Sequence, residues 1–235
     1  MVESIIMDSL EKRSHVQRAK AVIFDFDGTL AVLNIDFSLM RERVFEVMRA
    51  FGVKEDSIKE RYLLEIIDEV YPILWGKNPS DAKEFYEKAH QILHEIEMNA
   101  AREGKLIPGG EETLKTLRRK GMKVGIITRN CEKAVRQVFP EIDDYCDAFI
   151  SRDFVEKVKP HPDHLNSMLN VLKVAGKDSV MIGDHLIDIQ AGKIAGMITV
   201  GVLTGRITRN EFEEAGADYI LKDVSEIDRL LMEDI

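Results

Sequence analysis

The chain has few cysteines, no long hydrophobic run and no excess of positive charge, and each scarcity excludes a class of protein. Its 235 residues include two cysteines, Cys131 and Cys146, which give neither a disulfide framework nor a metal-binding spacing. No apolar run reaches the length of a membrane span, and residues 5–7 are too few for the core of a signal peptide. We therefore expect a cytoplasmic protein with no membrane partner.

The balance of charge also limits the partners. Acidic residues outnumber basic ones by 42 to 33, a net charge of −9, and the lysines and arginines form no stripe. A general binder of the nucleic-acid backbone is therefore not expected. A small phosphorylated ligand is not excluded, because it responds to the local charge at its site. The length allows one large α/β domain, or a core with a smaller insert.

One short stretch near the N-terminus organises the rest of the chain. Residues Ala21 to Phe24 are apolar, which is typical of a strand buried on both faces of a parallel sheet. Asp25 and Asp27 follow, so two carboxylates come to the carboxyl edge of the sheet, where α/β proteins bind their ligands. Mg²⁺ would relieve the repulsion between them, and Gly28 permits a tight turn. The alternative is a strand followed by an ordinary Asp-Gly turn.

The segment from Ala31 to Lys105 has the apolar spacing of helices and no convincing strand. One helix is predicted from Phe37 to a stop at Gly52, and a second over residues 58–70, halted by Pro72. A third opens at Pro79 or Ser80 and carries apolar residues to Ile96. We expect these helices to form a small cap domain, residues 34–105, inserted into a core of residues 19–33 and 106–235. Residues 1–18 are an N-terminal extension.

From Ile107 onward, strands and helices alternate. The predicted strands cover residues 123–128, 148–150, 180–182 and 198–202, with an edge strand at 219–221. The predicted helices cover residues 111–120, 132–139, 163–175, 187–195 and 225–232. Repeated strand–helix units with buried strands predict an α/β fold with a doubly wound, Rossmann-like parallel sheet.

Polar residues follow three of these strands. Thr128, Arg129 and Asn130 precede a helix, where a hydroxyl and backbone N–H groups suit a phosphate oxygen; taken alone, this motif is better explained as a simple helix cap. Lys159 lies in a loop that two prolines hold extended, so it either points inward at a phosphate or is solvated. Asp184 and Asp188 are four residues apart at a helix start, so both can face the sheet edge; the alternative is a cap and a helix-face acid. Three histidines, His161, His164 and His185, lie beside these positions.

Taken together and in order, these motifs resemble those of the haloacid dehalogenase superfamily. The resemblance rests on Asp25-x-Asp27-Gly-Thr, Thr128, Lys159 and Gly183-Asp184-x-x-x-Asp188. It covers the chain from about Ala21 to the C-terminus. The helical insert after the first motif resembles the branch that includes phosphoglycolate phosphatases and β-phosphoglucomutases.

The resemblance implies an enzyme with a defined mechanism. Asp25 would attack phosphorus to form an aspartyl-phosphate, and Asp27 would act as general acid and then general base. Mg²⁺ would be held by Asp25, the backbone carbonyl of Asp27 and Asp184, with Asp188 acting through water. Thr128 and Lys159 would grip the phosphoryl oxygens. Gly28, Asn130 and Arg129 are further candidates for binding phosphate or substrate, and Arg129 could reach a second anionic group of the substrate. Dehalogenases of the superfamily lack an acid at the position of Asp27, so phosphoryl chemistry is favoured.

We therefore expect a Mg²⁺-dependent phosphomonoesterase, monomeric or homodimeric, acting on phosphoglycolate or a sugar phosphate. The cap is expected to close over the active site and to carry specificity. The nearest alternative is a phosphomutase of the same fold. A phospho-accepting signalling module is disfavoured because such domains are shorter and lack the helical insert. An inactive relative that serves as a binding protein is a further alternative.

Overall fold

The computed structural model describes residues 16–232, which divide into two compact units. Residues 34–103 form one unit, and the described residues on either side of them form the other. The expected N-terminal extension, apart from residues 16–18, lies outside the described residues.

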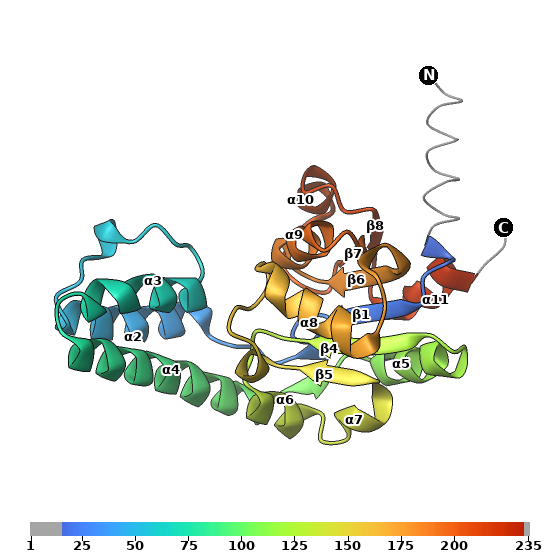
Figure 1. Cartoon of the computed structure of the whole chain (residues 1–235). Helices are drawn as coiled ribbons and strands as arrows, with labels where there is room; N and C mark the ends of the chain where they lie inside the picture. The colour runs from blue at the N-terminus through green and yellow to red at the C-terminus, as the bar shows by residue number, and fades with distance from the viewer. Residues whose placement is uncertain (1–15, 233–235) are drawn as a thin grey trace. The chain divides into compact units, whose positions relative to one another are not determined.

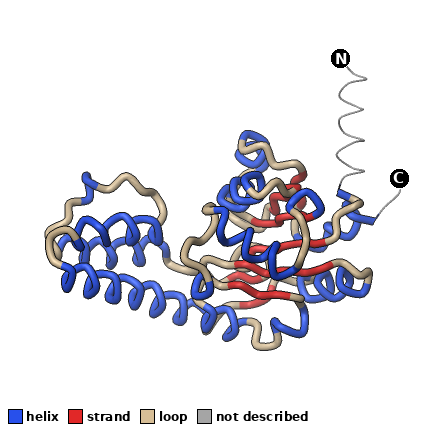
Figure 2. The backbone as a smooth tube through the Cα atoms, viewed as in Figure 1, coloured by secondary structure: helices blue, strands red, loops and turns tan. Residues whose placement is uncertain are grey.

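A six-stranded parallel sheet forms the centre of the second unit, as Figures 1 and 2 show. Its strand order is β5-β4-β1-β6-β7-β8, and every neighbouring pair is parallel. The strands are β1 (Ala21–Asp25), β4 (Lys123–Ile127), β5 (Ala148–Ile150), β6 (Ser179–Gly183), β7 (Ile198–Val202) and β8 (Tyr219–Leu221). The predicted doubly wound parallel sheet is confirmed. Because the chain runs outward from β1 in both directions, the carboxyl end of β1 is the expected ligand site.

Helices of this unit pack on the sheet and bury its strands. They are α5 (Gly110–Arg119), α6 (Glu132–Val138), α7 (Ile142–Tyr145), α8 (Pro162–Leu172), α9 (Leu186–Ile194), α10 (Arg209–Glu214) and α11 (Ile227–Met232). Leu165 and Met168 of α8 are buried in one cluster with Ile23 of β1. Gly125 of β4 permits this close contact, because a Cβ there would lie 2.6 Å from the sulfur of Met168.

The sequence missed two short helices of this unit. α10 has a capping box formed by Thr208 and Glu211, but Phe212 is its only buried residue among those described, so no apolar stripe marks it. α7 has four residues, too few to show a helical period. The helix expected over residues 225–232 is instead a 3₁₀ turn, Val224–Glu226, followed by α11.

The other unit contains the three expected helices, and both ends of the second one differ from the prediction. They are α2 (Phe37–Ala50), α3 (Leu63–Trp75) and α4 (Pro79–Ala101), and Asn78 caps α4 with Pro79 at its first position. The predicted start of the second helix at Ile58 was wrong, because backbone N–H groups of Lys59 and Glu60 bind the carboxylate of Glu69 instead. The predicted stop at Pro72 was also wrong, because α3 contains Pro72 and continues for three more residues to Trp75.

The expectation of no strand between Ala31 and Lys105 was wrong at both ends of that segment. β2 (Ala31–Val32) pairs antiparallel with β3 (Lys105–Leu106), joining the two connections between the units. Two-residue strands carry no readable periodicity, so the sequence could not indicate them.

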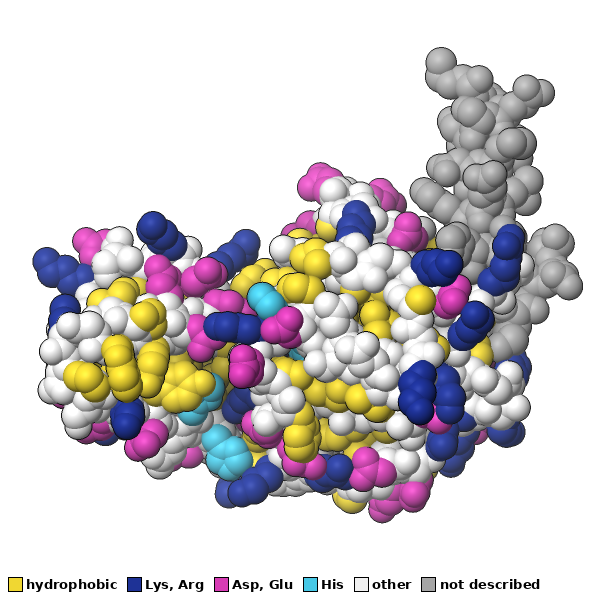
Figure 3. All heavy atoms as spheres, in the orientation of Figure 1, with side chains coloured by type: hydrophobic (Ala, Val, Ile, Leu, Met, Phe, Trp, Pro, Cys, Tyr) yellow, Lys and Arg dark blue, Asp and Glu magenta, His cyan; other side chains and the backbone are white. Residues whose placement is uncertain are grey.

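The surface agrees with the scattered charges of the sequence. On the face that Figure 3 shows, basic and acidic side chains are interspersed. Among the described helices, none is both long and apolar enough to cross a membrane. Cys131 and Cys146 are both buried and are not joined in a disulfide.

Candidate active site

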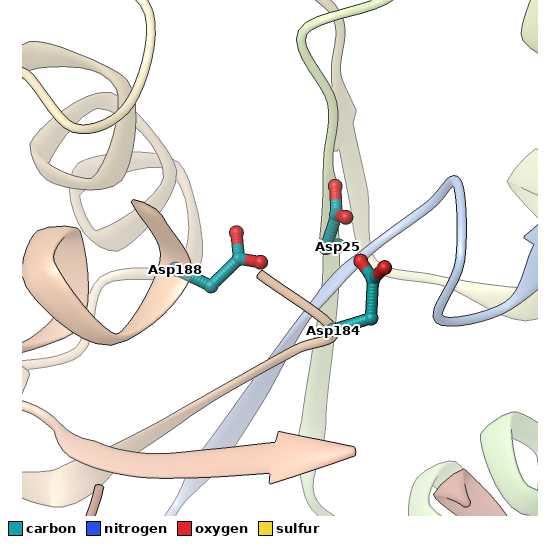
Figure 4. Close-up of side chains that lie close together, drawn as sticks. All are labelled: Asp25, Asp184 and Asp188. Carbon is teal, nitrogen blue, oxygen red and sulfur yellow. The ribbon is translucent and has the colours of Figure 1, made fainter. Parts of the chain in front are cut away.

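Three carboxylates gather at the carboxyl edge of the sheet. Asp25 is the last residue of β1, Asp184 follows β6, and Asp188 lies in the first turn of α9. One carboxylate oxygen from each lies within 4.8 Å of the others, and Figure 4 shows the three side chains around one point. The sequence predicted that strand ends would bring these acids together, and in the structure they are together.

The start of α9 orients Asp188. Its Oδ2 accepts a hydrogen bond from the backbone N–H of His185 at 3.1 Å, and the His185 side chain accepts one from the N–H of Ile187 at 3.2 Å. This reciprocal capping box fixes the first turn of the helix. The side chain of Asp188 is thereby fully buried and aimed at the edge of the sheet.

Lys159 joins two of the three carboxylates. Its Nζ donates to Asp25 Oδ1 at 2.5 Å and to Asp188 Oδ1 at 2.6 Å. Only 2% of Lys159 is exposed, whereas Lys157, two residues earlier, is exposed. Burial alone lowers the pKa of Lys159, but the carboxylates of Asp188 and Asp25 outweigh it and raise the pKa. The lysine is therefore a fixed positive charge.

One ammonium does not balance three carboxylates. Burial raises the pKa of Asp25 to about 7, with a further contribution from Asp188 that Lys159 opposes. Burial also raises the pKa of Asp184 to about 8, with Asp25 and Asp188 adding to the effect. A hard dication prefers oxygen ligands and would supply the missing charge, so this donor set fits Mg²⁺.

Glycines leave room for these carboxylates. Gly28 has a φ of +82°, and a Cβ on it would lie 2.2 Å from Asp184 Oδ2. A Cβ on Gly205 would lie 2.0 Å from the same oxygen, and one on Gly183 would lie 2.1 Å from Asp188 Oδ2. A larger residue at any of these positions would displace a carboxylate.

The sequence reasoning missed Thr204 and Gly205, which follow β7. Thr204 Oγ1 donates a hydrogen bond of 2.5 Å to the carbonyl of Gly28 and so holds the turn after β1. Their position could have indicated them, because they follow the carboxyl end of β7, the neighbour of β6 in the sheet. A threonine and a glycine in such a loop do not by themselves indicate a metal or phosphate site.

Asp27 lies in the turn after β1, and its side chain is not one of the three clustered carboxylates. Its Oδ1 accepts a hydrogen bond from the backbone N–H of Leu33 at 2.9 Å. The side chain is therefore oriented by the turn, partly buried, two residues after Asp25. Its roles as proton donor and as a ligand through its carbonyl remain predictions.

The predicted phosphate-binding residues after β4 are buried. Thr128 is 1% exposed, and its Oγ1 accepts a hydrogen bond from the N–H of Asn130 at 3.1 Å. Asn130 Nδ2 is buried and has no hydrogen-bond partner among residues 16–232. The guanidinium of Arg129 donates to the backbone carbonyl of Lys159, a contact that the sequence did not predict.

Comparison with known proteins agrees with this geometry. Residues 22–202 match the family described as haloacid dehalogenase-like hydrolase. An Arabidopsis thaliana protein described as containing a haloacid dehalogenase-like hydrolase domain is 29% identical over 91% of this chain and 84% of its own. The pyrophosphatase PpaX of Bacillus mycoides is 27% identical over 89% of this chain and 95% of its own.

Solved structures show the same fold. A predicted phosphoglycolate phosphatase from Haemophilus somnus has a TM-score of 0.61 at 19% identity, and the match covers 91% of this chain and 98% of that one. A predicted β-phosphoglucomutase from Thermotoga maritima has a TM-score of 0.56 at 25% identity, and the match covers 92% of this chain and 100% of that one.

Proposed function

The chain belongs to the haloacid dehalogenase-like hydrolase family, and we propose that it is a Mg²⁺-dependent phosphatase acting through an aspartyl-phosphate. One observation carries the proposal: Asp25 ends the central strand, its Oδ1 is held by Lys159, and Asp184 and Asp188 complete a carboxylate cluster around it. A nucleophilic carboxylate must be ionised, and Lys159 together with a bound cation favours that form.

The proposed reaction has two displacements. In the first, a carboxylate oxygen of Asp25 forms a bond to phosphorus while the bond from phosphorus to the leaving alcohol breaks, and Asp27 gives that alcohol a proton. In the second, water attacks phosphorus, Asp27 takes a proton from it, and the bond between phosphorus and Asp25 breaks. The products are the free alcohol and inorganic phosphate.

Lys159 and the residues after β4 would hold the phosphoryl group. The Lys159 ammonium is a point charge beside the nucleophile, and Thr128, Asn130 and the backbone of Gly28 would donate hydrogen bonds to phosphoryl oxygens. Asn130 Nδ2 supports this assignment, because it is buried with no partner in the described part of the chain, and buried N–H groups normally have one.

Asp25, Asp184, the carbonyl of Asp27 and, through water, Asp188 would hold Mg²⁺. The bound ion would neutralise charge on the phosphoryl group and on the carboxylates. The raised pKa values of Asp25 and Asp184 support this, since these groups retain protons until another cation replaces them.

Phosphate release from a panel of substrates tests the proposal. The panel contains phosphoglycolate, sugar phosphates and, because of the similarity to PpaX, inorganic pyrophosphate. We expect turnover with Mg²⁺, none with chelator, and none in Asp25→Asn. Folded protein that binds Mg²⁺ but releases no phosphate would contradict the proposal.

A phosphomutase is the second candidate, favoured by the similarity to the Thermotoga maritima protein. Product analysis with a sugar 1-phosphate separates the two functions. A phosphatase gives free sugar and phosphate, whereas a mutase gives the isomeric sugar phosphate and little free phosphate.

A further inference from the structure

Lys159 is placed by its backbone as well as by its ion pairs. Its N–H donates to Nδ1 of His164 at 3.2 Å, and its carbonyl accepts from the guanidinium of Arg129. Both polar groups of this peptide segment are therefore fixed by side chains. The ammonium of a long, flexible lysine is positioned more precisely when the N–H and the carbonyl of that lysine are both held by hydrogen bonds.

His164 lies at the start of α8 and is fully buried. Because its Nδ1 accepts a hydrogen bond from an N–H, the proton of the neutral ring must be on Nε2. Nε2 lies 3.1 Å from the carbonyl of Ile150, the last residue of β5, and donates to it. Burial and the neighbouring Lys159 ammonium lower the pKa of His164 to about 4, so this tautomer is the neutral-pH form.

The same carbonyl also accepts a hydrogen bond from Thr128. The N–H of Thr128 donates to Ile150 O at 3.2 Å. The contacts thus close a ring: Thr128 binds Ile150, Ile150 binds His164, His164 binds Lys159, Lys159 binds Arg129, and Arg129 follows Thr128 in the chain. Arg152 supports the ring by donating to the carbonyl of Arg129 at 3.1 Å.

We propose that His164 and Arg129 are positioning residues that hold Lys159 at a fixed distance from Thr128. Neither touches the reacting atoms in this account. They set the spacing of the two groups that would grip the phosphoryl oxygens, so the inference rests on the proposed phosphatase function.

A matched set of His164 variants separates the two hydrogen bonds of the ring. His164→Asn places an oxygen where Nδ1 lies and keeps the acceptor for Lys159. His164→Gln places an amide nitrogen where Nε2 lies and keeps the donor to Ile150, while His164→Leu keeps neither. His161→Asn is the control, since His161 is an exposed residue that caps α8 and asparagine caps helices equally well.

We expect kcat to fall about 10- to 100-fold in His164→Leu and His164→Gln and less than about 5-fold in His164→Asn. Inorganic phosphate should bind the Mg²⁺-loaded protein in the same order, as measured by calorimetry. Equal losses in the Asn and Leu variants, tracking their free energies of unfolding, would overturn the positioning role. Absence of phosphate release by the wild-type protein would instead contradict the proposed function.

The imidazole itself gives a readout that does not depend on activity. In ¹⁵N-labelled protein, His164 should keep the chemical shifts of the neutral Nε2–H tautomer at about pH 5.5, where exposed histidines are charged. The signal is assigned by its absence in His164→Asn. Titration of His164 near pH 6.5 would show that the ring of hydrogen bonds does not exist.

Arg129 is tested on the same substrates. If it holds the carbonyl of Lys159, Arg129→Met should slow all substrates by a similar factor. Combining it with His164→Leu should then cost little more than the worse single variant, because both act through one segment. A loss confined to substrates with a second anionic group would overturn this role and place Arg129 on the substrate.

Discussion

Binding of Mg²⁺ should release protons, in a number that the structure predicts. The pKa values of Asp25 and Asp184 are about 7 and about 8. At pH 7, about half of the Asp25 groups and about nine-tenths of the Asp184 groups are therefore protonated. An ion that needs both as carboxylates displaces about 1.4 protons at pH 7 and about 0.1 at pH 9.

The affinity for Mg²⁺ should follow the same protons. The apparent Kd for Mg²⁺ is expected to fall steeply as the pH rises from 6 to 8, where both acids lose their protons, and to level off near pH 9. Without the ion, the two acids affect stability in the opposite sense. Because their folded-state pKa values lie above the ordinary 3.8, their contribution to stability is present below about pH 4 and is lost as the pH rises through 7 and 8. Added Mg²⁺ should therefore stabilise the protein most at alkaline pH.

Calorimetry in buffers of different ionisation enthalpy measures both the affinity and the proton count. Asp184→Asn should weaken binding at least about 10-fold and release fewer protons. Glu112→Gln should change neither, since Glu112 is an exposed acid on α5. An affinity for Mg²⁺ that is constant from pH 6 to pH 9, with no proton release, would show that Asp25 and Asp184 do not exchange protons for the ion.

Three further predictions concern single residues. Lys159→Met should abolish turnover and destabilise the ion-free protein by about 3 kcal/mol at pH 8, as urea unfolding can measure. The loss should be smaller at pH 6, where Asp25 is mostly protonated. Lys157→Met is the control, and equal effects of the two substitutions would contradict a role for the Lys159 ion pairs. The pKa of His164 is about 4 in the folded protein, against 6.5 for an ordinary histidine. The wild-type protein should therefore lose about 3 kcal/mol of its free energy of unfolding as the pH falls from 6.5 to 4, and His164→Leu should not show this loss. Gly205→Ala should weaken Mg²⁺ binding about 10-fold, because the added Cβ would displace the Asp184 carboxylate. Gly110→Ala is the control, since a Cβ there meets nothing closer than 3.6 Å. Equal Mg²⁺ binding by the two variants would show that the Asp184 carboxylate can move without loss of the site.

Much of the site could be predicted because strand ends mark it in the sequence. Asp25, Thr128 and Asp184 each follow a run of buried apolar residues, and parallel strands end at one edge. Lys159 was harder to predict, since it is the ninth residue after the end of β5. Its placement depends on two prolines and on contacts with residues that are distant in the sequence.

The supporting contacts could not be predicted, because nothing local encodes them. His164 has the spacing of an ordinary core residue of α8, and its two hydrogen bonds go to a strand end and to a loop. Thr204 reaches Gly28, 176 residues away in the chain. The short strands β2 and β3 likewise depend on pairing between segments about 70 residues apart, which one sequence does not show.

Detection of the covalent intermediate tests the central claim most directly. The protein is mixed with Mg²⁺ and a substrate that it turns over, quenched in acid, reduced with borohydride and digested. An aspartyl-phosphate is reduced to an alcohol, so the account predicts homoserine at position 25 and nowhere else, and none without substrate. Continued phosphate release with unmodified Asp25, or with homoserine at Asp184 instead, would contradict the account.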